Sequence, residues 1–210
     1  MKLITTSLFA TFLATLALAS DSPTQIEEGI PGYKTVPITW EVQPTLDGPP
    51  VLLNGTVREV HAQLLAINPD YDAQVAPVLA AAVTAVTTSD KRNSDNSPLI
   101  SKRDSITCGV WPSASRRRIE EGIRYLRFDV GGRPGNGPGP GNCGRVSCSY
   151  NAAIWWCNEN RVPYQLQGFW QIGDGAQAVV NGCASGQASQ VSGQRFHGGN
   201  WNVIVRGDSC

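Results

Sequence analysis

The sequence predicts an α+β fold for its C-terminal half: two helices packed on one face of a mainly antiparallel sheet, stabilised by disulfides. Three observations support this. Apolar residues recur at helical spacing in segments 113–128 and 166–183, and strand-like apolar patterns occupy 145–158, 190–197 and 201–206. All six cysteines follow residue 103. Two helices with one apolar face each are covered most simply when both lie on the same face of a sheet.

The first 19 residues predict a signal peptide. Lys2 gives a positive start, residues 3–18 are apolar apart from Thr and Ser, and a small-x-small site ends at Ala19, where we expect cleavage. This stretch is shorter than the roughly 20 apolar residues of a membrane span, and the rest of the chain has none of that length. The sequence therefore predicts a secreted, extracellular protein without a stable membrane anchor.

Residues 20–103 predict an acidic pro-region. They carry 10 acidic and 6 basic side chains, a balance of −4, whereas residues 104–210 carry 7 acidic and 10 basic ones, a balance of +3. All ten cations after residue 103 are arginines. An excess of three is too small for a nucleic-acid-binding face, so no nucleic-acid partner is expected.

The pro-region is predicted to end at a dibasic processing site. Residues 87–103 are polar and predict a linker, and they contain Lys91-Arg92 and Lys102-Arg103. A kexin-type secretory protease that cleaves after Arg103 would release a mature domain, residues 104–210. Two alternatives stay open: the pro-region is removed, or it folds together with the mature part.

Local patterns suggest that the pro-region has structure of its own. Segments 35–42 and 50–54 have strand composition. Thr56 and Glu59 have the spacing of a capping box, which predicts a helix with an apolar face that includes Val57, Val60, Leu64 and Leu65. A second, Ala-rich helix is expected at 76–86. Asn54 begins an N-glycosylation sequon and is a predicted glycosylation site.

The cysteines predict three disulfides, because an even number in a short secreted segment is typical of a disulfide framework. Six cysteines allow 15 pairings, and the sequence does not choose among them. None has C-x-x-C spacing, so neither a metal site nor a cofactor is expected. The cysteines are Cys108, Cys143, Cys148, Cys157, Cys183 and Cys210.

The remaining elements of the mature part follow in order. A short strand is expected at 107–111, then a helix through residue 128 with Ile119, Ile123 and Leu126 on its apolar face. Residues 130–142 contain six Gly and three Pro and predict an exposed loop.

Residues 145–158 predict one central strand covered on both sides. Its expected faces are Val146, Cys148, Tyr150, Ala152, Ile154 and Trp156 against Ala153, Trp155 and Cys157. After the second helix, a hairpin through 198–200 closes the chain.

Candidate catalytic residues are few. His197 is the only histidine after residue 103, and it is expected at the exposed end of a hairpin. A secreted hydrolase, such as a small ribonuclease, could combine this histidine with carboxylates and arginines in acid–base catalysis. Its candidates are Glu120, Glu121, Glu159, Arg145 and Arg195. No recognised catalytic motif surrounds them, so the sequence favours a binding role over catalysis.

Aromatic residues suggest a third possibility, a carbohydrate-binding or inhibitor protein. Adjacent Trp155 and Trp156 must face opposite sides of a strand, and an exposed tryptophan can stack on a sugar or a protein partner. Packing volume is the more common use of tryptophan in small disulfide domains. The candidate binding residues are Trp155, Trp201, His197 and Arg145.

The C-terminal half resembles small secreted fungal effector proteins, and it is similar to the calcium-blocking killer toxin family of smut fungi. The resemblance spans about 119–210 and rests on CSYNAAIWWCN at 148–158, VNGC at 180–183 and WNVIV at 201–205 with the terminal Cys210. It implies a stable extracellular toxin, effector or antagonist that acts by binding. We expect a monomer whose target is an extracellular protein, channel or glycan. That family has more cysteines and a Lys-bearing active surface, so no active-site residue is transferred.

Overall fold

The computed structural model describes residues 29–78, 81 and 104–210. The predicted signal peptide and residues 87–103, with both dibasic pairs, lie outside the described residues. Of the expected helix 76–86, residues 76–78 and 81 are described and are helical, and the rest lies outside the described residues. Before the gap, the elements are β1 (Lys34–Thr35), β2 (Thr39–Val42), β3 (Val51–Asn54), α1 (Val57–Ile67) and α2 (Tyr71–Gln74). After it come β4 (Ser105–Cys108), β5 (Ala114–Ser115), α4 (Arg116–Arg124), η1 (Tyr125–Asp129), β6 (Arg133–Asn136), β7 (Asn142–Ser149), β8 (Ala152–Asn158), β9 (Tyr164–Gln165), α5 (Phe169–Cys183), β10 (Gln190–Val191), β11 (Gly193–His197) and β12 (Trp201–Gly207).

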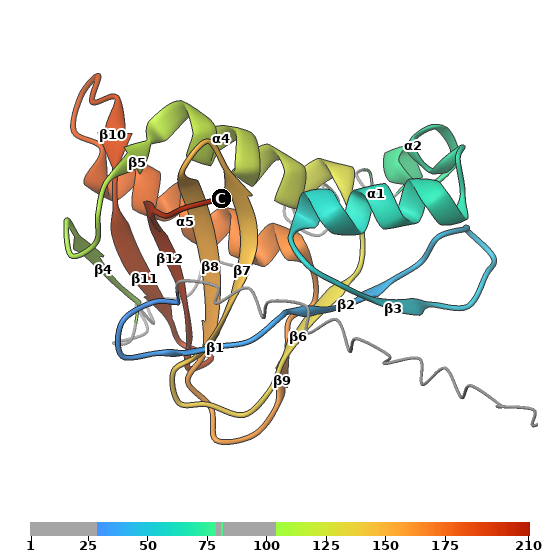
Figure 1. Cartoon of the computed structure of the whole chain (residues 1–210), viewed down its shortest axis with the longest axis horizontal. Helices are drawn as coiled ribbons and strands as arrows, with labels where there is room; N and C mark the ends of the chain where they lie inside the picture. Colours follow the sequence, from blue (N-terminus) through green and yellow to red (C-terminus); the bar gives the residue numbers. More distant parts are fainter. Residues whose placement is uncertain (1–28, 79–80, 82–103) are drawn as a thin grey trace, which may run out of the picture.

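The largest sheet has six strands in the order β1-β7-β8-β12-β11-β4, and only its β1–β7 pairing is parallel. Helices α4 and α5 pack together against it (Figure 1). This confirms a mixed α+β fold with a mainly antiparallel sheet. The two helices predicted for the C-terminal half are α4 and α5, but the described residues as a whole contain four α-helices and two further sheets, so the prediction was incomplete. The additional helices, α1 and α2, come from the N-terminal segment.

The helical faces were predicted correctly. Ile119, Ile123 and Leu126 are all buried on α4 and the π-helical turn that continues it. At the start of α1, the Thr56 backbone N–H donates to Glu59 Oε2 over 2.6 Å and the capping box is complete. A capping box depends only on residues three apart, which explains why the sequence was sufficient to locate it.

The expected single strand at 145–158 is two strands. β7 and β8 form a hairpin whose turn is Tyr150–Asn151, with φ of 49° and 58°. β8 is the central strand, and all seven of its residues are buried. The turn and an irregularity between Arg145 and Ser147 change the face assignment: Cys148 lies opposite Ala153 and on the face away from the helices.

The expected exposed loop at 130–142 was also wrong. It contains β6, which pairs with β2 on one side and β9 on the other. Pro134 and Asn136 of β6 are buried. A segment rich in Gly and Pro forms a strand here because a partner strand from the N-terminal segment supplies its backbone hydrogen bonds.

Both faces of the main sheet are covered. On the helix face, Ile154, Trp156 and Val203 belong to one large apolar cluster with α4, α5 and the N-terminal segment. On the other face, Trp155 and Ile204 pack with Ile30 in a smaller cluster. The N-terminal segment therefore contributes to both.

Three disulfides are present, as predicted, and they settle the pairing: Cys108–Cys183, Cys143–Cys157 and Cys148–Cys210. The first joins the edge strand β4 to the end of α5. The second connects directly opposed residues of β7 and β8. The third attaches the C-terminus to β7. Within residues 104–210, the disulfides therefore fix the first strand, the central hairpin and the last residue.

Candidate functional site

The four residues predicted to bind a partner form two separate pairs. Trp155 is fully buried, and its Nε1 donates to Asp208 Oδ2 over 3.1 Å, while the Arg145 guanidinium lies 5.7 Å from its ring centroid. Trp201 is 5% exposed and stacks on His197 with ring centroids 3.6 Å apart. Neither tryptophan presents a free face in this structure, so both act as packing residues.

His197 lies at the end of β11, but it is not the exposed residue that we expected. Its Nε2 is buried and has no hydrogen-bond partner among the described residues. Loss of solvation, assisted by the nearby Arg195 charge, lowers the pKa of His197 to about 3. The imidazole is therefore neutral at physiological pH, and its buried nitrogen does not face a space that a substrate could enter.

The burial of the Nε2 atom of the half-buried His197 predicts a pH-dependent stability. Above about pH 6.5 the ring is neutral in both the folded and the unfolded chain, and it contributes no pH dependence. As the pH falls from 6.5 towards about 3, only the unfolded chain takes up the proton. The free energy of unfolding then decreases by at most about 1.4 kcal/mol for each pH unit from this group.

Urea unfolding of the wild type and of His197→Phe between pH 4 and 7 measures this contribution. The phenylalanine keeps a ring on Trp201 but cannot titrate, so its stability should fall less steeply with acid. Val162→Ala, at a 63% exposed position without a titratable group, is the control and should keep the wild-type slope. Equal slopes for wild type and His197→Phe would contradict the assigned burial.

The carboxylates of the ribonuclease alternative are engaged elsewhere. Glu120 pairs with Arg116 at 2.9 Å on the same helix, and Glu121 with Arg118 at 2.8 Å. The hydrogen bond from Arg118 holds the pKa of Glu121 below its usual value. Glu159 accepts hydrogen bonds from the Gly141 N–H and the Asn202 amide. These carboxylates support the fold, and the structure does not gather them around His197.

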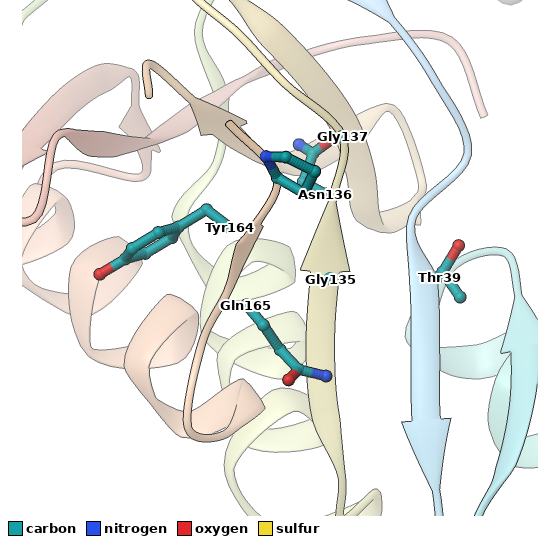
Figure 2. A pocket seen from close by; sticks show the side chains of 7 residues that line it. Thr39, Gly135, Asn136, Gly137, Tyr164 and Gln165 are labelled. Atoms are coloured by element: carbon teal, nitrogen blue, oxygen red, sulfur yellow. The ribbon is translucent and has the colours of Figure 1, made fainter. Parts of the chain in front are cut away.

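One hollow of about 280 Å³ lies where three strands meet. Figure 2 shows its lining residues on neighbouring strands: Thr39 on β2, Asn136 on β6, and Tyr164 and Gln165 on β9. Its lining has no ionised side chain. It is a shallow junction between the N-terminal segment and the C-terminal half.

A second hollow, of about 200 Å³, is polar and charged. Arg58 of α1 lies on one side of it, Glu121 of α4 on another, and Ser147 and Ser149 come from β7. Tyr150, at the tip of the β7–β8 hairpin, completes the rim. We call Arg58, Arg118, Glu121, Ser149 and Tyr150 the Tyr150 surface.

Tyr150 has an unusual conformation for so exposed an aromatic residue. Its side chain is 71% exposed, its φ is 49°, and the Arg118 guanidinium stacks on its ring 3.8 Å from the centroid. A left-handed conformation costs a residue other than Gly about 1 kcal/mol. Such strain is concentrated at functional sites.

The sequence did not reveal Tyr150 because it was placed inside a continuous strand. The available signal was the dipeptide Tyr150-Asn151 between two strand-like runs, since asparagine tolerates positive φ. A two-residue turn of this kind was overlooked because it lacks glycine.

The Tyr150 surface is electropositive. Arg58 lines the hollow, and Arg118 stacks on Tyr150. Arg117, whose side chain is 75% exposed, shares Glu121 with Arg118. The Glu121 carboxylate therefore pairs with two guanidinium groups and lines the same hollow as a third, that of Arg58. A surface of this charge favours an acidic partner.

Comparison of the chain with protein-family models, with curated proteins and with solved structures finds no match. None of the helices within the described ranges combines the length and the hydrophobicity that a membrane span requires. In the same part of the chain, no cluster of three His, Cys, Asp or Glu side chains is arranged to hold a metal ion.

Proposed function

We propose that this chain is a secreted killer-toxin-like or effector protein that acts outside the producing cell by binding an acidic protein on its target. The Tyr150 surface makes the contact. The observation that supports this most directly is Tyr150 itself, an exposed ring in a left-handed conformation beside a stacked guanidinium. Tyrosine and arginine are, with tryptophan, the residue types enriched in the energetically important centres of interfaces.

The framework around this surface suits a recognition protein. The hairpin that presents Tyr150 is fixed near its tip by Cys148–Cys210 and at its open end by Cys143–Cys157. A rigid support lowers the entropy cost of binding. The resemblance of the C-terminal half to killer toxins leads to the same functional class, although that family uses lysine where this chain has arginine.

Substitution of Tyr150 by asparagine separates binding from folding. Asparagine adopts positive φ more readily than tyrosine, so the turn should be as stable as in the wild type or more so. The aromatic contact is lost, and we expect at least a tenfold loss of potency. Growth inhibition of a panel of fungal and plant cells, with surface binding of fluorescently labelled protein, gives the two readouts.

Val162→Ala is the matched control, because Val162 is 63% exposed and does not line the Tyr150 hollow. It should keep full potency. Binding should weaken as salt rises, since screening reduces the attraction between guanidinium groups and carboxylates. If the wild type neither binds nor inhibits any cell tested, the proposed function is contradicted. If the potency and binding of Tyr150→Asn equal those of the wild type, the assignment of the Tyr150 surface as the contact is contradicted.

A further inference from the structure

The N-terminal segment, residues 29–78, is built into the fold of the C-terminal half. In Figure 1 this segment passes the lower ends of the main-sheet strands at β1 and continues into β2 beside β6. β2 pairs with β6 from Thr39–Gly135 to Glu41–Arg133, and β1 pairs with β7 at its start. Pairing in two sheets indicates that this segment is a structural part of the fold and not only a spacer.

Side chains of this segment fill the interior of the C-terminal half. Trp40 is fully buried and stacks on Phe169 of α5, with ring centroids 3.7 Å apart. Ile38, also buried, belongs to the same apolar cluster. On the opposite face of the main sheet, Ile30 is buried beside Trp155, and the Tyr33 hydroxyl accepts a hydrogen bond from Gln194 over 3.1 Å.

Two glycines of the C-terminal half leave room for this segment. A Cβ on Gly144 would lie 2.2 Å from the Ile38 side chain, and a Cβ on Gly132 would lie 2.4 Å from the Glu41 carbonyl oxygen. Gly132 also has a φ of 130°, which other residues rarely adopt. The C-terminal half is therefore shaped to receive the N-terminal segment.

The segment is not covalently bridged to the C-terminal half. All six cysteines follow residue 103, and the three disulfides join them to one another. The opposite charge balances of −4 and +3 derived above favour association without a covalent link. The connecting sequence contains the two dibasic pairs Lys91-Arg92 and Lys102-Arg103.

The first residue after the predicted cut is already anchored. The Asp104 carboxylate accepts a hydrogen bond from the Gly198 N–H over 3.0 Å and lies 3.9 Å from the Arg195 guanidinium. β4 begins at the next residue and pairs with β11. Hydrolysis of the Arg103–Asp104 peptide bond, with water as the second reactant, would leave these contacts in place.

We propose that the processed protein is a two-chain complex in which the N-terminal chain stays bound, without a disulfide, to the chain that begins at Asp104. This differs from the expectation of an isolated mature domain of residues 104–210. It rests on the predicted dibasic processing, and it deepens the proposed function, because Arg58 of the Tyr150 surface belongs to the N-terminal chain. The N-terminal chain is a subunit of the active form, not a discarded propeptide.

Native mass spectrometry and gel filtration of the protein secreted by a host with a kexin-type protease test the proposal. We expect one native species that separates into two chains under denaturing, non-reducing conditions, the larger starting at Asp104. A C-terminal chain that is folded and alone would overturn it, as would a single uncut chain. These measurements do not require the target, so they can contradict the two-chain proposal independently of the binding assay that tests the proposed function.

A glycine variant tests the contact surface itself. In Gly144→Ala the added Cβ meets Ile38, and we expect at least a tenfold rise in the dissociation constant of the two chains. Gly182→Ala is the matched control, because a Cβ there would be 3.5 Å from its nearest neighbour, an ordinary contact. If Gly144→Ala misfolds, the substitution is repeated in an uncut chain in which both dibasic pairs, Lys91-Arg92 and Lys102-Arg103, are changed to Ala. A native circular dichroism spectrum of that chain would show that the defect of Gly144→Ala lies in the association of the two chains.

Discussion

Trp40→Ala is expected to lower the free energy of unfolding by about 3–5 kcal/mol, the usual cost of removing a buried aromatic side chain. Trp40 is fully buried, stacks on Phe169 and donates from Nε1 to the Gly55 carbonyl oxygen over 2.6 Å. The substitution therefore removes apolar contacts and one hydrogen bond and leaves a cavity between β2 and α5. Urea unfolding of the uncut chain, followed by circular dichroism, measures the loss.

Leu52→Ala is the control for this experiment. Leu52 lies on the adjacent strand β3 but is 67% exposed, so its truncation should change the stability by no more than about 0.5 kcal/mol. A small effect of Trp40→Ala would mean that the N-terminal segment does not share the core, and would contradict the two-chain proposal as well.

The elements that the sequence predicted well depend on neighbouring residues. The apolar spacing of Ile119, Ile123 and Leu126 marked the buried side of one helix, and Thr56 with Glu59 marked the start of another. The closing hairpin formed where Gly198-Gly199-Asn200 interrupts two apolar runs, and Asn200 there has a φ of 59°. In each case the signal and the structure lie within a few residues of each other.

The features that were missed depend on contacts between distant parts of the chain. β6 exists because β2 pairs with it, and no local pattern in a Gly- and Pro-rich segment reveals such a partner. Trp155 and Trp201 are buried by layers that come from elsewhere in the chain, including Ile30 for Trp155. The boundary between pro-region and mature domain was predicted from the cysteines and the dibasic pairs. Neither of these shows whether the two parts pack against each other.

The candidate site shows the same division. Its arginines were visible on the helix that begins at Arg116, but no local pattern could place Arg58, from a distant helix, beside them. The expected binding residues were chosen by type, and type alone cannot distinguish a buried tryptophan from an exposed one. Tyr150 was overlooked because its strand-like neighbours concealed a turn.

Loss of the Cys108–Cys183 disulfide has the second large expected effect. The bridge joins residues 75 apart in sequence, and a loop of that size corresponds to roughly 4 kcal/mol of stabilisation in the chain-entropy account. It also holds β4, an edge strand that pairs only with β11 among the described residues. The double variant Cys108→Ala/Cys183→Ala should therefore be less stable by about this amount.

Hydrogen exchange shows where this stability is lost. In the double variant, the amides of β4 should exchange much faster than in the wild type. The amides of the central strand β8 should keep the same rank of protection among the strands as in the wild type. Cys148→Ala/Cys210→Ala provides the comparison, because its bridge closes a similar separation of 62 residues but holds the C-terminus. If the β4 amides exchange at the same rate in both variants, the edge strand is held by its pairing with β11 and its contact with α5. The disulfide then stabilises the protein only by reducing the conformational entropy of the unfolded chain.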